Sequence, residues 1–224
     1  MQSITDGLWT DADLIQQPAG VRLPVRMNVA RLDDGSLWVH SPLEPTEARV
    51  AAVQALGEVR HLVAPSLMHH LYIGGWSERF PDAEVHGVPG LAAKRTDVAF
   101  DHELGEPHPA WAGTIDQTMV GGAPGLNEFA FYYRPAKALL CTDLVFNIVE
   151  PPNLATSMVL VLAGTRGRFA RSRAWWSFTK DKQARNTSIQ TIAGWDIDVI
   201  SMGHGDPITE GGGDLFRAAW ADSL

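Results

Sequence analysis

Residues 66–76 read SLMHHLYIGGW and carry the clearest indication of the fold. They follow a short apolar run at residues 61–64, which predicts a β-strand, and they lead through a loop into a predicted helix that reaches Phe80. In layered α/β folds, ligands bind outside the ends of strands, where loops converge. His69 and His70 stand at such a position, so we expect this stretch to supply part of a functional site.

Two later stretches have the same strand-end character. Residues 139–146, LLCTDLVF, place Asp143 in an apolar strand, where a charge is costly unless it is paired, hydrogen-bonded or bound to a metal. Residues 200–207, ISMGHGDP, place His204 between two glycines, which allow the backbone to approach a site closely. Taken singly, Asp143 could instead accept hydrogen bonds from a turn, and His204 could cap a loop.

The rest of the chain alternates predicted strands and helices, which indicates a layered α/β fold. We expect strands over residues 20–40, 84–88, 128–133, 138–145 and 197–202, helices over 46–56, 92–94, 155–190 and 215–220, and Pro- and Gly-rich loops with strands between them over 101–128. The sequence contains no internal repeat and no long linker. We therefore predict that residues 1–224 form a single domain.

Together, in their order and strand context, the three stretches resemble the metallo-β-lactamase superfamily, and more narrowly a DUF4336-like branch with a His-His pair in its first motif. The resemblance runs from about residue 20 to about residue 215 and implies an αββα four-layer sandwich. The family motif reads H-x-H-x-D-H before Ile-Gly-Gly, which here is residues 73–75. On this alignment Leu67 replaces the first histidine, His69 matches the second, Leu71 replaces the aspartate and Tyr72 the last histidine.

The rest of the family's ligand set is also incomplete. Gly122, in the stretch GGAPG, stands where a further histidine is usual, whereas Asp143 matches the bridging aspartate and His204 the final histidine. The resemblance therefore implies a degenerate site with His69, Asp143 and His204 as metal ligands, and with His70 as a replacement ligand. Such a set could hold at most one divalent ion, zinc or iron. The alternative is a protein that binds no metal.

Three functions follow from this degenerate site. The first is a mononuclear metal-dependent hydrolase of unknown substrate, with Asp143, His69 and Tyr72 as catalytic residues. The second is a pseudoenzyme that binds a small, anionic ligand or a protein partner without hydrolysis. The third is a metal-free enzyme that uses Tyr72 with His69 and His70 as acid and base. Metal in the purified protein would separate the first from the other two.

The remaining histidines and the single cysteine receive no role from the sequence. We expect the side chains of five histidines to be structural or exposed, namely His40, His61, His86, His102 and His108. Cys141 lies within an apolar run and is expected to be a buried small hydrophobe.

Residues 166–185 form a basic segment that lies between the Asp143 and His204 motifs. It holds seven arginines and lysines against one acid, Asp181, in a chain whose net charge is −8. A solvated helix face is the usual explanation. The sharper hypothesis is an anion-binding site formed by Arg166, Arg168 and Arg171, since guanidinium groups suit carboxylates and phosphates. Aromatic residues are interleaved with the basic ones, so binding of single-stranded nucleic acid is a further alternative for this segment.

Composition narrows the class of protein. The chain is 45% hydrophobic and 20% charged, as in a globular protein with a core, and its pI of about 5.4 argues against a protein that coats nucleic acid or anionic membrane. One cysteine cannot form an internal disulfide. The start of the chain does not resemble a signal peptide, and no stretch has the roughly 20 apolar residues of a membrane helix. We expect a cytoplasmic protein with a small-molecule ligand, and the eight tryptophans leave an oligomer open.

Overall fold

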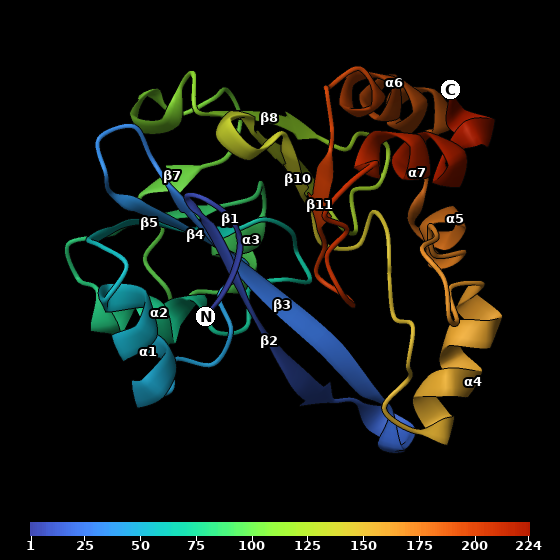
Figure 1. Ribbon diagram of the computed structural model, residues 1–224, viewed down its shortest axis with the longest axis horizontal. Helices are drawn as coiled ribbons and strands as arrows, with labels where there is room; N and C mark the ends of the chain where they lie inside the picture. Colours follow the sequence, from blue (N-terminus) through green and yellow to red (C-terminus); the bar gives the residue numbers. More distant parts are fainter.

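The computed structural model describes residues 1–224 and contains two β-sheets that lie between two groups of helices (Figure 1). The first sheet has seven strands in the order β1-β2-β3-β4-β5-β6-β7, and the second has four in the order β11-β10-β9-β8. In the first sheet β1 to β4 pair antiparallel, and β4 to β7 pair parallel. In the second sheet β10 runs parallel to β11 and antiparallel to β9.

The bounds of the elements are as follows. The strands are β1 (Gln2–Thr5), β2 (Leu8–Gln16), β3 (Arg22–Arg31), β4 (Leu37–His40), β5 (Val59–Ala64), β6 (Glu84–Gly87), β7 (His102–Glu103), β8 (Ile115–Met119), β9 (Phe129–Tyr133), β10 (Ala138–Leu140) and β11 (Val199–Ser201). The α-helices are α1 (Glu47–Gln54), α2 (Ile73–Arg79), α3 (Leu91–Lys94), α4 (Leu154–Ala163), α5 (Ala174–Phe178), α6 (Lys182–Ala193) and α7 (Gly212–Ala219). Short 3-10 turns are η1 (Pro18–Gly20), η2 (Pro109–Trp111), η3 (Arg134–Ala136) and η4 (Ala221–Ser223).

A buried core joins the two sheets. Trp38 on β4 and Phe131 on β9 are both fully buried, and their rings meet edge to face with centroids 4.9 Å apart. Successive residues of a strand point to opposite faces, so Leu140 on β10 packs into this core while Leu139 faces the other way. Leu139 contributes to a second core beneath α6 and α7, which also contains Phe216. Both faces of the second sheet are therefore buried.

The helices cover the outer faces of this pair of sheets. In Figure 1, α1 and α2 lie on the outside of the seven-stranded sheet, and α6 and α7 lie over the four-stranded sheet. Contacts of α2 with β5 and β6, of α6 with β8 and of α7 with β11 agree with this arrangement. The result is the αββα sandwich that the sequence predicts. None of the helices combines the length and apolar character that crossing a membrane requires.

The largest differences from the sequence prediction lie in two parts of the chain. No strand is predicted for residues 1–16, but they form β1 and β2. β2 pairs with β3 over its whole length, although some of its outward positions are acidic. The predicted helical region 155–190 is three helices rather than one. Gly164, at φ +77°, ends α4, and the side chain of Asp181 caps the start of α6.

Candidate functional site

Three side chains meet where the loops after β5, β10 and β11 converge. His69 lies between β5 and α2, Asp143 follows β10, and His204 follows β11. His204 Nε2 lies 3.2 Å from Asp143 Oδ1 and 3.3 Å from His69 Nε2, and His69 Nε2 lies 3.6 Å from Asp143 Oδ2. Because β10 and β11 are parallel, their carboxyl ends lie at the same edge of the sheet, which brings Asp143 and His204 together. We refer to these three residues as the trio.

Hydrogen bonds orient both imidazoles of the trio. His204 Nδ1 lies 2.7 Å from the carbonyl oxygen of Pro24, which can only accept, so Nδ1 carries a proton, and in the neutral imidazole Nε2 presents a lone pair. His69 Nδ1 lies 3.0 Å from Ser41 Oγ, which orients the ring, and this hydroxyl can either donate to Nδ1 or accept from it. Phe146 stacks on the ring of His204 with centroids 4.8 Å apart. Such second partners hold histidine ligands in metal sites.

The Asp143 carboxylate is buried between these imidazoles. Burial raises its pKa, but the charge of His69 and the contacts with both imidazoles outweigh burial and hold the pKa well below its ordinary value. Its Oδ2 atom is buried and has no hydrogen-bond partner. An unpartnered buried carboxylate oxygen is costly, which favours a cation as its partner.

The geometry of the trio fits one divalent metal ion. Ligand atoms bound tetrahedrally to zinc at 2.0–2.1 Å lie about 3.3 Å from one another. Two separations agree with this value, 3.2 Å between His204 Nε2 and Asp143 Oδ1 and 3.3 Å between the two Nε2 atoms, and His69 Nε2 lies 3.6 Å from the other carboxylate oxygen, Oδ2. Two imidazole nitrogens and one carboxylate oxygen are donors suited to zinc or non-haem iron. Three protein ligands leave an open coordination position, which is the arrangement of catalytic rather than structural metal sites.

The turn that carries Asp143 is held by Glu128, which the sequence analysis does not single out. Glu128 precedes β9 and is fully buried; its Oε1 accepts hydrogen bonds from the backbone N–H groups of Thr142 (2.6 Å) and Asp143 (3.0 Å). Burial, aided by the charge of Asp143, raises the pKa of Glu128 to about 8. The only signal in the sequence is an acid directly before the apolar run 129–133. β10 ends at Leu140 rather than Val145 because this turn begins there.

The glycines beside His204 allow close approach, as the sequence suggests. A Cβ atom on Gly203 would lie 2.7 Å from Cε1 of His69 and 3.1 Å from the backbone of Thr142. Gly205 has φ +102°, and a Cβ atom there would lie 2.1 Å from the carbonyl oxygen of Asn147. Both positions therefore require glycine, which holds the loop against the other two loops of the site.

Two small hollows lie beside the trio, and Met68 lines both. The first, of about 50 Å³, is lined by His69 and His204 and by mostly apolar neighbours, and Tyr72 is among them. The second, of about 70 Å³, is lined by Asp143 together with Phe146, Trp175 and Phe178. Tyr72 thus lies in reach of the same space as the two histidines.

Other residues named from the sequence lie around the trio or away from it. His70 lines the first hollow, but its Nδ1 lies 3.1 Å from a guanidinium nitrogen of Arg95 and it is not one of the three clustered ligands. Leu71 is 57% exposed at the rim and offers no donor. At Gly122, φ is +73° and a Cβ atom would lie 1.9 Å from the carbonyl oxygen of Asp181, so the backbone itself leaves no room for a histidine.

The arginines of the basic segment do not line either hollow beside the trio. Arg168 donates to the carbonyl oxygen of Gly164 at the end of α4. Arg171 pairs with both oxygens of Asp222 at 2.8 and 3.0 Å and lies over the ring of Trp220. Arg168 and Arg171 line a separate hollow of about 350 Å³, and Arg166 is exposed. An anion site formed by these arginines stays a prediction.

Comparison with known proteins places the chain in a family and shows its fold. Residues 6–199 match DUF4336, a domain of unknown function, and no curated protein matches significantly. A metallo-β-lactamase from Pontibacter korlensis superposes with a TM-score of 0.64 at 15% identity, over 96% of this chain and 97% of that one. The metallo-β-lactamase FIM-1 from Pseudomonas aeruginosa, in its mono-zinc form, gives 0.63 at 13% identity, over 100% and 95%. One from Erythrobacter litoralis gives 0.66 at 13%, over 100% and 96%.

Identities at this level establish a common architecture and nothing about chemistry. The superposition extends over almost the whole of each chain, so both sheets and both helical layers are shared. The family match likewise covers most of the sequence, including Asp143 and the loop that carries His69. The chain therefore belongs to the DUF4336 family and has the metallo-β-lactamase fold.

Proposed function

We propose that the protein is a mononuclear metal-dependent hydrolase whose single catalytic ion is held by His69, Asp143 and His204. The observation that carries this proposal is the buried Asp143 carboxylate between two imidazoles: Oδ1 lies 3.2 Å from His204 Nε2, and the unpartnered Oδ2 lies 3.6 Å from His69 Nε2. Three ligands leave room for water and for a substrate oxygen. Leu67 and Leu71, at positions that carry ligands in the superfamily, supply none.

In this mechanism the side chains orient the reacting groups and exclude bulk water, and none of them forms a covalent bond with the substrate. A bound divalent ion would supply Lewis acidity, which acidifies water and polarises a carbonyl or phosphoryl oxygen. The Pro24 carbonyl keeps His204 in the tautomer that presents Nε2 to the site. Asp143, held ionised, is placed to steer a proton, and Tyr72 lines the hollow beside His69 and His204, where its hydroxyl can donate to a leaving group.

The surroundings of the trio favour a substrate with apolar groups on both sides of the bond that is cleaved. Leu43 and Leu71 line one hollow, and Phe146 and Phe178 line the other. Both hollows are small, at about 50 and 70 Å³, so they suit short acyl or alkyl groups rather than large rings.

A substrate panel tests the proposal directly. Untagged protein reconstituted with zinc or with ferrous iron would be assayed against short-chain esters, thioesters, lactones and phosphodiesters. We expect hydrolysis of at least one class by the wild type and a loss of about 100-fold or more in Asp143→Asn and His204→Gln. Asp196→Asn, which removes an exposed carboxylate paired with Lys137, is the matched control. Equal rates in Asp143→Asn and Asp196→Asn would refute a role for the trio.

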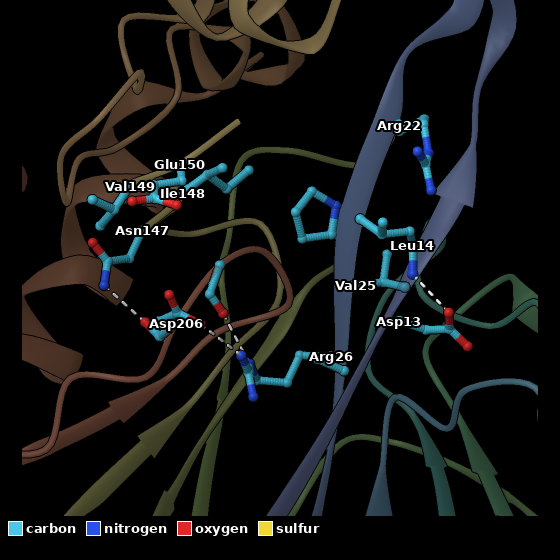
Figure 2. Close-up of a pocket in the computed structure, with 13 residues that line it drawn as sticks. Asp13, Leu14, Arg22, Val25, Arg26, Asn147, Ile148, Val149, Glu150 and Asp206 are labelled. Carbon is cyan, nitrogen blue, oxygen red and sulfur yellow. Dashed lines mark hydrogen bonds and ion pairs between the residues drawn. The ribbon is translucent and has the colours of Figure 1, made fainter. Parts of the chain in front are cut away.

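Binding without turnover is the second candidate, and it is favoured by a groove next to the trio. The groove has a volume of about 780 Å³ and runs between the β2–β3 hairpin and residues 147–150 (Figure 2). Arg22 and Arg26 line it together with Asp13, Glu150 and Asp206. Arg26 is paired with Asp206 at 3.3 Å, so Arg22 is the guanidinium that would meet an anionic ligand. Saturable binding of an anion with no hydrolysis in any metal form would favour this function.

A further inference from the structure

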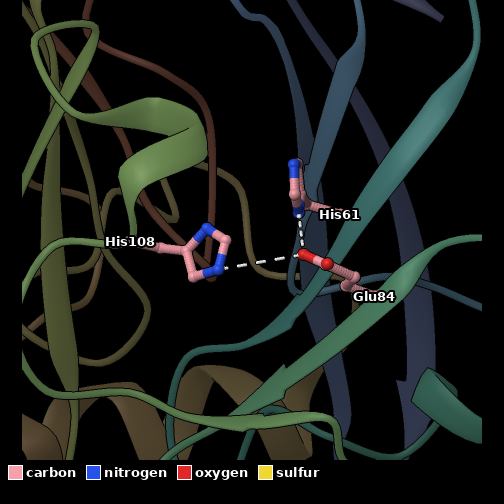
Figure 3. Close-up of side chains that lie close together, drawn as sticks. All are labelled: His61, Glu84 and His108. Carbon is pink, nitrogen blue, oxygen red and sulfur yellow. Dashed lines mark ion pairs between the residues drawn. The ribbon is translucent and has the colours of Figure 1, made fainter.

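A second group of potential ligands lies at the opposite end of β5 from the trio. It consists of His61, Glu84, His86, His102 and His108, which we call the Glu84 cluster. The strands β5, β6 and β7 lie side by side and parallel, and the register pairs His61 with Glu84 and His86 with His102. Residues two apart on a strand face the same way, so four of these side chains share one face. His108 approaches the same face from the segment before η2 (Figure 3).

The carboxylate of Glu84 is the centre of this group. Its Oε2 lies 3.3 Å from His61 Nδ1, 3.7 Å from His102 Nε2, 3.8 Å from His86 Nε2 and 3.9 Å from His108 Nε2. Despite these neighbours, Oε2 is buried and has no hydrogen-bond partner. A buried carboxylate oxygen without a donor is costly, so an arrangement that leaves it unpaired among four imidazoles needs a physical reason.

A shared metal ion supplies that reason. Atoms bound to one tetrahedral zinc ion lie about 3.3 Å apart, which is longer than a good N–H···O hydrogen bond. His61 Nδ1 lies 3.2 Å from His86 Nε2 and 3.3 Å from Glu84 Oε2, and the ligand atoms of His61, Glu84 and His108 all lie within 4.8 Å of one another. Imidazole-rich sites with one carboxylate suit zinc and its neighbours in the first transition row.

The imidazoles are held in place by aromatic packing. The ring of Trp111 lies 5.3 Å from that of His61, 4.8 Å from His86 and 4.9 Å from His108, measured between centroids. Trp111 itself is fully buried and donates from Nε1 to Gln117 Oε1 at 2.9 Å. The donor atoms are therefore gathered before any ion binds, which lowers the entropic cost of binding.

We propose that His61, Glu84 and His108 bind one zinc-class divalent ion at a structural site separate from the trio, with His86, whose Nε2 lies 3.2 Å from His61 Nδ1, as the fourth ligand. Four protein ligands close the coordination sphere, with His102 beside them, whereas the trio leaves it open. The ion would join β5 and β6 to the segment before η2 and so secure the edge of the seven-stranded sheet, where β7 has two residues. The chain would then hold two ions at separate sites, instead of the single ion that the sequence motifs suggest.

Metal counting on untagged protein tests this proposal. Zinc retained per chain after dialysis would be measured by elemental analysis in the wild type, in His61→Gln/His108→Gln and in His69→Gln/His204→Gln. We expect the first double variant to retain one equivalent fewer than the wild type. We also expect zinc to raise the melting temperature of the chelator-treated second double variant, in which only the Glu84 cluster can respond. Glu103→Gln, which alters a neighbouring carboxylate on β7, should behave as the wild type.

The outcomes separate this proposal from the proposed function. If the trio binds no metal, the wild type retains one equivalent and His61→Gln/His108→Gln retains none, and the Glu84 cluster still stands. If His61→Gln/His108→Gln retains as much zinc as the wild type, the cluster binds no ion. Should that variant fail to fold, Glu84→Gln replaces it. Loss of a direct ligand should weaken binding by about tenfold or more, and an unchanged affinity would overturn the proposal.

Discussion

Gly203 shows how one residue without a side chain determines the position of a candidate ligand. The loop after β11 passes so close to His69 that any Cβ atom at this position would touch the imidazole at Cε1. The same loop places His204 Nδ1 against the Pro24 carbonyl. The separation of the two Nε2 atoms, 3.3 Å, therefore depends on a backbone contact and not on the histidines alone.

The substitution Gly203→Ala should weaken metal binding at the trio by pressing the loop after β11 away from His69 and from the Thr142 backbone. The added methyl group would push the His69 ring away from His204, and sub-ångström displacements already disturb a metal site. We expect at least a tenfold loss of zinc affinity in a titration of chelator-treated protein. Gly105→Ala is the control, because a Cβ atom there meets nothing within 4 Å. Equal affinities in the two variants would show that the contact does not position His69.

At the scale of elements, the start of β9 controls the turn that follows β10. The two strands pair antiparallel, so Glu128, just before β9, lies beside the turn that leaves the end of β10. Its carboxyl group satisfies the N–H groups of Thr142 and Asp143, which the end of the strand would otherwise leave unpaired in the interior. Trp175 on α5 closes the other side by donating from Nε1 to the Asp143 carbonyl at 2.6 Å.

We predict that Glu128→Leu and Glu128→Gln behave differently. Oε1 accepts from both N–H groups, and Oε2 accepts a longer bond of 3.2 Å from the Asp143 N–H. An amide oxygen can take the place of Oε1, so Glu128→Gln should lose only this longer bond and retain most of the stability and the metal affinity. Glu128→Leu leaves both donors unsatisfied, at a cost of about 1–3 kcal/mol each in the free energy of unfolding. Chemical denaturation and zinc titration measure the two effects. Indistinguishable stabilities would show that Glu128 does not support this turn.

At the scale of the whole molecule, buried polar groups link the two sheets. Asn28 on β3 accepts from the Ser201 hydroxyl on β11, and its amide nitrogen lies 3.4 Å from His40 Nδ1. His40 is fully buried on β4 and meets Phe131 of the second sheet edge to face. Burial, reinforced by His69, lowers the pKa of His40 to about 3. The interface between the sheets therefore contains a histidine that must stay neutral.

This histidine should make the protein sensitive to acid. Its pKa is near 6.5 in the unfolded chain and about 3 in the folded one, so the unfolded state binds more protons between these values. Its contribution to stability is fully present above pH 6.5 and is lost as the pH falls towards 3, at up to about 1.4 kcal/mol per pH unit. Urea denaturation between pH 7.5 and 5 should show a shallower decline in His40→Gln. Parallel curves for the two proteins would contradict the prediction.

The sequence by itself determines the alternating α/β pattern, the resemblance to the superfamily, and the placement of His69, Asp143 and His204 at strand ends. These features are local, because each lies within a few residues of the strand that predicts it. The Glu84 cluster could not be found in this way. Its members are spread over residues 61–108 and meet only through the parallel register of β5, β6 and β7 and the path of the chain before η2. Glu128 supports a turn on the neighbouring strand, and the carbonyl oxygen of Asp181 leaves no room for a side chain at position 122. Both features depend on tertiary contacts, so the sequence alone could not reveal them.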